Sequence, residues 1–361
     1  RLRGGAQGAP RRGGRPGGRA PPAMALRVTM EDGVPVFRPT MADMRRPFEE
    51  YIERCEPCLA QAGIGKIVPP REWVPRKAGY EDVEMEVPQA IKQNVTGGRG
   101  VYRSLLVECK PMSLKEGFAP VATTPEHCCP RGGQEEVERR FWRNMTFRPP
   151  MYAADIEGSL MDEDCDGWNI RNLDTLLTRT LRQHTRARIP GVMSPYLYFG
   201  MWRSFFAWHT EDMDLYSMNY LHFGEPKTWY CVPPSDRGKF ERAVQSLAPD
   251  LFLQCGQFLR HKELMVAPTV LAKLGVKVLK CQQAKREWII NYPGAYHAGF
   301  NHGYNCAEST NFATKGWIPI GEKATACSCS RDSVRIDMRI FTGYSSDEEE
   351  EDEEEESMGE E

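Results

Sequence analysis

No run of about 18 consecutive apolar residues, the length that a membrane-spanning helix requires, occurs in the 361-residue sequence. The first residues are rich in Arg and Gly and contain no apolar stretch typical of a secretory signal. No internal repeat is evident. We therefore expect an intracellular soluble protein. In a reducing compartment, the 12 Cys residues are expected to be buried thiols or metal ligands rather than disulfides.

Two tails of opposite charge flank a body with the composition of a globular protein, 40% hydrophobic and 27% charged. Residues 1–23 contain seven Gly, four Pro and six Arg and are expected to be a disordered leader, with Met24 as the true start. The alternative is an Arg/Gly arm that binds nucleic acid. Residues 347–361 contain twelve acids and no base, which predicts a disordered acidic tail that is either simply solvated or contacts histones. The slightly basic body suits a polyanion or a basic peptide equally well.

The body contains many short strand-like runs that do not alternate with helices. An extended segment at Val34–Pro39 precedes a helical pattern from Met41 to Ala62, which is too small to fold alone and should dock on something larger. Further expected elements are a turn at Gly97–Gly100, a helix at Glu135–Asn144, and strands at Tyr216–Gly224, Thr228–Pro233, Trp288–Tyr292 and Ser309–Phe312. This pattern favours a mainly β fold with flanking helices, either a β-sandwich or a jelly roll.

His209 and Glu211 are separated by one residue and could bind one ion together. On a strand, residues two apart project from the same face, and His297 could complete the set from a later, Gly-flanked segment. Two His and one carboxylate form the facial triad of non-haem Fe(II) oxygenases, which leaves three metal positions open. Such a pair alone is weak evidence, because it is more often a surface or core pair.

The cosubstrate of such a centre would be 2-oxoglutarate, whose remote carboxylate needs a cation and hydrogen-bond donors. Lys227 and Asn219 follow the His209–Glu211 pair on strand-like runs, and Tyr152 could add its hydroxyl. Taken singly, Lys227 is more often a solvated surface residue and Asn219 a satisfied core amide.

A second cluster supplies three thiolates and an imidazole. Cys255, His261, Cys327 and Cys329 match the ligand set of a closed structural Zn²⁺ site, although the spacing is not the common Cys-x-x-Cys. The alternative is four unrelated residues in a chain that uses Cys freely.

With these residues identified, the chain resembles the subfamily-4 Jumonji histone lysine demethylases, which carry a JmjN and a JmjC domain. The resemblance covers roughly residues 34–341. Its motifs are Tyr196–Trp202, Phe206–Ser217, Asn219–Lys227, Tyr296–Gly303 and Asn305–Thr314, with Phe37–Thr40 and Pro69–Trp73 at the ends of the JmjN segment. It implies a double-stranded β-helix, a cupin-like jelly roll, as the JmjC core with a docked JmjN segment. The implied domains are JmjN at 34–76, a mixed linker region at 77–162, JmjC with the zinc site at 163–329 and an extension at 330–346.

The resemblance also implies residue roles. By similarity, His209, Glu211 and His297 hold Fe(II), Tyr152, Asn219 and Lys227 hold 2-oxoglutarate, and the four Cys/His residues hold zinc. The methyl-lysine cage would comprise Gly191, Tyr198, Glu211, Ser309, Thr310 and Asn311, and Asp155 would contact the peptide. A quaternary ammonium cannot donate a hydrogen bond, so oxygens and an aromatic wall suit it.

The implied reaction is the hydroxylation of N-methyl groups on di- and trimethylated lysine 9 and lysine 36 of histone H3, with release of formaldehyde, succinate and CO₂. The expected partners are the methylated H3 tail and chromatin in the nucleus, without a membrane and without sequence-specific nucleic acid. One departure is Leu106, which stands where the family has a peptide-contacting asparagine. It favours the alternative of a catalytically weak chromatin scaffold, whereas the complete ligand sets favour the enzyme. A third hypothesis, a protein hydroxylase, would not require the cage.

Overall fold

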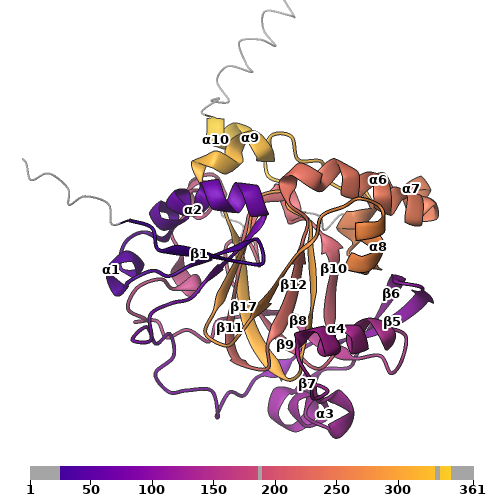
Figure 1. Cartoon of the computed structure of the whole chain (residues 1–361). Coiled ribbons are helices and arrows are strands. Elements are labelled where there is room, and N and C mark those ends of the chain that lie inside the picture. The colour runs from indigo at the N-terminus through magenta and orange to yellow at the C-terminus, as the bar shows by residue number, and fades with distance from the viewer. Residues whose placement is uncertain (1–24, 186–188, 330–333, 343–361) are drawn as a thin grey trace, which may run out of the picture.

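The computed structural model describes residues 25–185, 189–329 and 334–342. Two β-sheets, whose strands are mostly antiparallel, form its centre (Figure 1). The larger sheet has the order β1 (Val28–Glu31), β2 (Val34–Phe37), β3 (Ile64–Ile67), β15 (Trp288–Asn291), β11 (Tyr216–Gly224), β17 (Asn305–Phe312), β9 (Tyr196–Gly200), β8 (Met151–Glu157), β5 (Ile91–Gly98), β6 (Val101–Glu108) and β13 (Leu264–Val266). The smaller sheet has the order β10 (Phe205–His209), β16 (His297–Asn301), β12 (Lys227–Cys231) and β14 (Leu279–Gln283). A two-stranded ribbon joins β4 (Glu86–Val87) to β7 (Met112–Ser113). The expected mainly β class with a jelly-roll core is confirmed.

Short helices surround the sheets (Figure 1). They are α1 (Met41–Met44), α2 (Phe48–Ala62), α3 (Ala119–Ala122), α4 (Gln134–Arg143), α5 (Leu176–His184), α6 (Arg237–Leu247), α7 (Pro249–Gln254), α8 (Pro268–Lys273), α9 (Ile318–Gly321) and α10 (Arg339–Thr342). Figure 1 shows α6, α7 and α8 gathered at one corner of the sheets. Within the described ranges, no helix has the length and apolar character needed to cross a bilayer. The expected leader (1–23) and acidic tail (347–361) lie outside the described residues.

The helix expected from Met41 to Ala62 is broken in two. The α1 helix ends at Met44 and α2 begins at Phe48, directly after Pro47. A proline disfavours helical conformation in the residue before it, and Pro47 itself has ψ near 130°, outside the helical region. The expected apolar face is nevertheless buried, with no member more than 4% exposed: Met44, Phe48, Tyr51, Ile52 and Cys55.

The N-terminal segment docks by extending the larger sheet. The β3 strand pairs antiparallel with β15, and β2 pairs in parallel with β3. The α2 helix packs on the same sheet, where the ring of Phe48 makes edge contacts with Trp168 and Phe312. These contacts confirm that the segment folds against the larger unit, as its small apolar face predicts.

The remaining expected elements are present, each within four residues of its predicted bounds. The β5–β6 hairpin turns through Arg99 and Gly100, whose φ angles of 55° and 85° are both positive, the geometry of a two-residue turn matched to strand twist. The helix α4 and the strands β11, β12, β15 and β17 occupy the predicted segments.

Candidate active site

His209 and His297 face each other across adjacent strands of the smaller sheet. His209 is the last residue of β10, His297 is the first of β16, and the two are register partners. Glu211 lies just beyond the end of β10, so the premise that the His-x-Glu pair lies on one strand is wrong. The turn after the strand, rather than strand alternation, brings Glu211 to the two imidazoles. The ligand atoms of these three residues, here called the triad, all lie within 4.8 Å of one another.

Backbone carbonyls orient both imidazoles. Nδ1 of His209 lies 2.7 Å from the Ala207 carbonyl oxygen, and Nδ1 of His297 lies 3.0 Å from that of Ala295. Each Nδ1–H therefore donates to a carbonyl, which leaves the Nε2 lone pair free for a metal. The donor set thus fits a divalent ion.

The electrostatics of the triad favour a neutral His209 beside a charged Glu211. Burial, together with neighbouring His297, holds the pKa of His209 well below its usual value. Burial alone would raise the pKa of Glu211, but its close contact with His297 and the nearby His209 and Lys262 side chains hold it well below the usual range. Nε2 of His297 lies 3.3 Å from Oε1 of Glu211, close to the separation of about 3 Å expected for adjacent ligands at about 2.1 Å from one ion.

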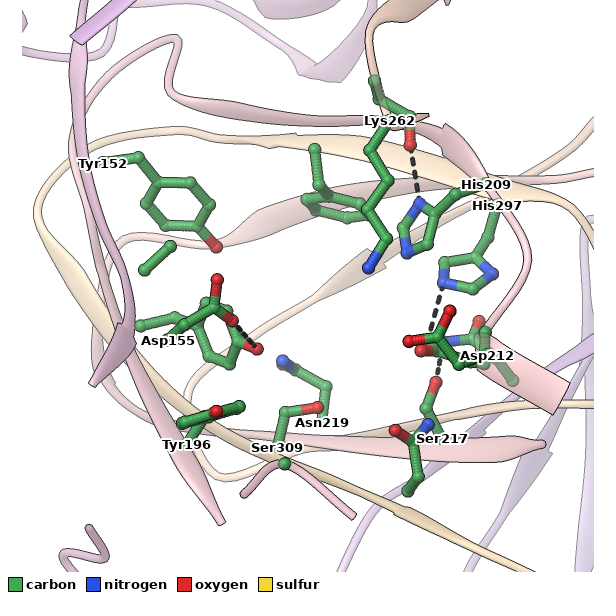
Figure 2. Close-up of a pocket in the computed structure, with 18 of the residues that line it drawn as sticks. Tyr152, Asp155, Tyr196, His209, Asp212, Ser217, Asn219, Lys262, His297 and Ser309 are labelled. Carbon is green, nitrogen blue, oxygen red and sulfur yellow. Dashed lines mark hydrogen bonds and ion pairs between the residues drawn. The ribbon is translucent and has the colours of Figure 1, made fainter. Parts of the chain in front are cut away.

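The triad lines one wall of a cavity of about 460 Å³ between the two sheets (Figure 2). Ser217 and Asn219 of β11 and Ser309 of β17 line the opposite wall. These residues share a face because Asn219 and Ser309 are register partners and strand side chains alternate. A metal bound by the triad would therefore face a polar surface that can hold a small ligand.

The three expected cosubstrate residues meet in this cavity. The Lys227 ammonium donates to the Tyr152 hydroxyl at 3.1 Å, and Lys227 is only 1% exposed. Burial lowers the pKa of Lys227 to about 7. The buried Oδ1 of Asn219 has no partner among the described residues. Within the described part of the chain, Lys227 has no counter-ion and lies beside an unsatisfied polar atom, an arrangement that fits a site for an anionic ligand.

The expected cage residues also line the cavity, with their polar groups already oriented. The Tyr198 hydroxyl donates to Asp155 Oδ1 at 2.7 Å. Burial and the Asp155 carboxylate raise the pKa of Tyr198 well above its usual value, so the phenol remains a donor. The Gly191 carbonyl accepts the backbone N–H of Asn311 at 3.0 Å and the hydroxyl of Thr310 at 3.3 Å. Every expected cage and peptide residue is in the lining: Asp155, Gly191, Tyr198, Glu211, Ser309, Thr310 and Asn311.

Several lining residues were not predicted from the sequence, among them Asn291, Ser217, Lys262 and Asp212. Asn291, on β15, donates through Nδ2 to the Ser217 hydroxyl at 3.0 Å, and its buried Oδ1 has no partner in the described ranges. The polar residues at alternate positions of the apolar β11 run were a detectable signal for Ser217. Lys262 and Asp212 also line the cavity, and Lys262 projects into it near His209 (Figure 2). Both are adjacent in sequence to expected metal ligands.

The expected zinc ligands form a second cluster, with all ligand atoms within 4.8 Å of one another. Sγ of Cys255 lies 3.7 Å from Sγ of Cys327, and Nε2 of His261 lies 3.2 Å from the same sulfur. Two thiolates bound to Zn²⁺ at about 2.3 Å in a tetrahedron are separated by about 3.8 Å. Burial alone would raise the pKa of Cys327, but hydrogen bonds from the Cys329 backbone and from His261 lower it to about 6. The cluster therefore fits zinc.

Arg260 connects the two clusters. It precedes His261 in the sequence, and its guanidinium donates to the Glu211 carbonyl and to Asp214 Oδ1, each at 3.0 Å. Arg237 donates to the other oxygen of Asp214 at 2.9 Å. The side chains of Arg260 and Asp214 are only 9% and 5% exposed, so this ion pair is shielded from water. Arg260 thereby anchors the turn that carries Glu211.

We expect Arg260→Ala to lower the free energy of unfolding by about 3–5 kcal/mol, the usual cost of removing one partner of a buried ion pair. Asp214 would keep only Arg237, and the Glu211 carbonyl would lose its donor. Urea unfolding measures the change. Arg242→Ala, at an exposed position of α6, is the control and should change stability by less than about 0.5 kcal/mol. Equal stabilities for the two variants would contradict the anchoring role.

Comparisons with known proteins identify two domains. The model of the JmjC domain, described as a hydroxylase, matches residues 196–312, and the model of the jmjN domain matches residues 35–69. Mouse "Lysine-specific demethylase 4B" is 47% identical over 308 residues, which are 84% of this chain and 28% of the mouse protein. Rat "Lysine-specific demethylase 4D" is 41% identical over 85% of this chain and 60% of its own length. Human "Probable lysine-specific demethylase 4F" is 42% identical over 84% of this chain and 48% of its own length. The chain thus spans between about a quarter and three fifths of these relatives.

Proposed function

Because this chain belongs to the lysine-specific demethylase 4 family of JmjN- and JmjC-containing proteins, we propose that it removes methyl groups from lysine side chains of histone H3. The proposed reaction is Fe(II)- and 2-oxoglutarate-dependent hydroxylation of di- and trimethylated lysine 9 and lysine 36. The protein would act on chromatin in the nucleus.

The observation that carries this proposal is the convergence of the triad at a cavity whose other walls are polar. His209 and His297 present Nε2 and Glu211 presents a carboxylate oxygen to one point. Bound Fe(II) would supply O₂ chemistry at positions that the three residues leave open. The protein's own contribution is to orient the ligands through the Ala207 and Ala295 carbonyls and to bury both imidazoles from water.

The proposed roles of the remaining residues follow from their groups. Lys227 and Tyr152 would bind the remote carboxylate of 2-oxoglutarate, and Asn219 would complete its polar contacts. Tyr198 would form the aromatic wall of the cage, and the oxygens of Gly191, Ser309, Thr310 and Asn311 would surround the methylammonium. Asp155 would contact the peptide backbone or a basic side chain beside Tyr198.

We also propose that the four-residue Cys/His cluster binds a structural Zn²⁺ and that the functional units extend beyond the matched segments. The proposed JmjN unit covers residues 34–76, and the JmjC unit with its zinc cluster covers residues 163–329. The cluster at Cys255, His261, Cys327 and Cys329 supports the longer JmjC boundary, because two of its ligands lie after the matched segment.

The test is mass spectrometry of a trimethyl-lysine-9 H3 peptide incubated with the protein, Fe(II), ascorbate and 2-oxoglutarate. Stepwise losses of about 14 Da are expected, and they should vanish in His209→Ala. A parallel lysine-36 peptide tests the second site. Succinate formation without peptide turnover would contradict the proposed substrate, and absence of both products would favour a chromatin scaffold that retains the fold.

Binding of 2-oxoglutarate should weaken above pH 7. Burial lowers the pKa of Lys227 to about 7. Two titratable groups act on the Lys227 ammonium: Cys306, and Tyr152, whose hydroxyl accepts a hydrogen bond from it. Only the charged ammonium form of Lys227 attracts the carboxylate of 2-oxoglutarate. Above this pKa, Lys227 of the ligand-free protein must therefore take up a proton when 2-oxoglutarate binds. We expect the dissociation constant of 2-oxoglutarate to be flat below pH 7 and to rise up to roughly tenfold per pH unit above it.

Calorimetric titration of the anaerobic Fe(II) protein between pH 6 and pH 9 measures this profile. Lys227→Arg is the control, because a guanidinium remains charged across the range and should flatten the profile. A flat profile for the unmodified protein would contradict the proposed role of Lys227.

A further inference from the structure

A second cavity, of about 450 Å³, is nearly as large as the catalytic cavity and shares no lining residue with it. Helices α6 and α7, which lie together at one corner of the sheets, and the segment 256–260 form most of its lining (Figure 1). Thr210, Tyr296 and Thr325 complete the lining. The first two are adjacent in sequence to triad ligands, and the third lies two residues before a ligand of the Cys/His cluster. The second cavity therefore borders the segments that carry both clusters.

Positive charge dominates the lining of this second cavity. Arg237 and Arg242 of α6 and Arg260 line it, whereas Glu241 supplies the one carboxylate of the lining. Asp214 binds Arg237 and Arg260 but is buried outside the lining, and the cations outnumber the carboxylates even when it is counted. Arg237 is the first residue of α6, so the partial positive charge of a helix N-terminus adds to that of the side chains. The second cavity is therefore suited to an anion.

The three arginines have N–H groups that no described protein group accepts. A guanidinium carries five N–H donors. Arg260, which is only 9% exposed, gives one to the Glu211 carbonyl and one to Asp214, and its buried Nε has no partner among the described residues. All bonds of Arg237 come from Nε and Nη1, so Nη2 is free in the same part of the chain. Arg242 is exposed and has no hydrogen bond or ion pair to any described residue.

We propose that the second cavity binds a small phosphate-bearing molecule, either inorganic phosphate or a phosphomonoester, through Arg237, Arg242 and Arg260. A phosphate group carries a charge of about −1.5 to −2 at neutral pH and three acceptor oxygens. Guanidinium groups match these oxygens in pairs of parallel N–H···O bonds. A carboxylate has one charge and two oxygens, so it would use fewer of the free N–H groups. The volume lies in the range of small-molecule sites.

The bound phosphate would also brace the turn that carries Glu211. The Glu211 carbonyl accepts from the Arg260 guanidinium and from the Asp214 backbone N–H, each at 3.0 Å. A phosphate that binds the free N–H groups of Arg260 leaves these bonds intact and restricts the side chain that makes one of them. Occupancy of the second cavity should therefore make opening of this turn rarer.

Titration with inorganic phosphate, followed by the line width of its phosphorus NMR signal, tests the site. The full chain is used without added iron, because phosphate itself binds Fe(II). We expect saturable binding of one phosphate per chain. Arg242→Glu should weaken this binding at least about tenfold, the scale of losing one charge-assisted hydrogen bond. Arg182→Glu, at an exposed position of α5 outside the lining, is the matched control and should bind phosphate as the unmodified protein does.

Parallel titrations define the ligand class. If glycerol 3-phosphate binds more tightly than inorganic phosphate, the ligand is a phosphomonoester, and the reverse order assigns free phosphate. Acetate that binds as tightly as phosphate would overturn the phosphate class.

Residue-resolved hydrogen exchange tests the bracing of the turn. In the unmodified protein, saturating phosphate should slow exchange of the Asp214 amide at least about threefold, and in Arg242→Glu the same phosphate concentration should have a smaller effect. Unchanged exchange at saturation would overturn the bracing. Absence of saturable phosphate binding, or equal binding by Arg242→Glu and Arg182→Glu, would overturn the site itself. Neither result depends on demethylation, so the proposed function is tested separately.

Discussion

Glu211→Gln is expected to abolish Fe(II) binding and peptide demethylation while leaving the fold intact. Glu211 supplies the single negative charge of the triad, and its depressed pKa keeps it charged at neutral pH. The amide has nearly the same shape but no charge, and one of its two terminal atoms is a donor that cannot bind a cation. Replacing a residue that only hydrogen-bonds to a metal ligand lowers metal affinity about 10–100-fold. Replacing a ligand itself should therefore lower the Fe(II) affinity by more than about 100-fold.

Fe(II) affinity measured anaerobically by competition with a chelator, together with peptide mass spectrometry, tests this expectation. Glu225→Gln is the control, because Glu225 is exposed and lies outside the triad. Thermal unfolding should be similar for both variants. Unchanged Fe(II) affinity in Glu211→Gln would contradict the assignment of the triad as the metal site.

Cys327→Ser is expected to remove one zinc ion per chain and to unfold at least the region that the cluster joins. The Cys327 thiol lies at the centre of the cluster, in contact with Cys255, His261 and the Cys329 backbone. Binding of structural zinc contributes about 10–16 kcal/mol in small peptides, which is comparable to the whole stability of a typical domain. The expected result is therefore a large fall in thermal stability rather than a small shift.

Elemental analysis for zinc and a thermal unfolding scan measure this prediction. Cys128→Ser is the matched control, because Cys128 is an exposed thiol outside the cluster. Since Arg260 and Lys262 flank His261 and reach toward the triad, zinc loss should also weaken Fe(II) binding. Full zinc content in Cys327→Ser would show that this residue is not a ligand.

The two clusters differ in how far the sequence could define them. The zinc ligands come from two segments separated by at least 66 residues, and no local pattern joins the segments. The sequence could therefore suggest the set only because its residue types match those of known zinc sites. For the triad, the local argument named three residues that the structure brings together, but its reason for pairing His209 with Glu211 was partly wrong. Glu211 reaches the imidazoles through a turn with left-handed backbone at Met213 and Asp214, which Arg260 and Arg237 hold in place.

Some lining residues escaped detection because their role depends on the register of strands distant in sequence. Asn291 enters the cavity because β15 pairs with β11 opposite Ser217. Hydrophobic patterns report which face of a strand is buried, but they carry no information about which strand lies beside it.

The sequence by itself determined the elements, their apolar faces and the types of ligand available, because these depend on neighbouring residues and on side-chain chemistry. It also determined the fold class, through many short strands bounded by Gly and Pro and through extended motifs shared with relatives. Only the tertiary structure decided the convergence of the ligand atoms and the burial that lowers the pKa of Lys227. These features depend on contacts between segments far apart in the chain, whose geometry no local pattern encodes.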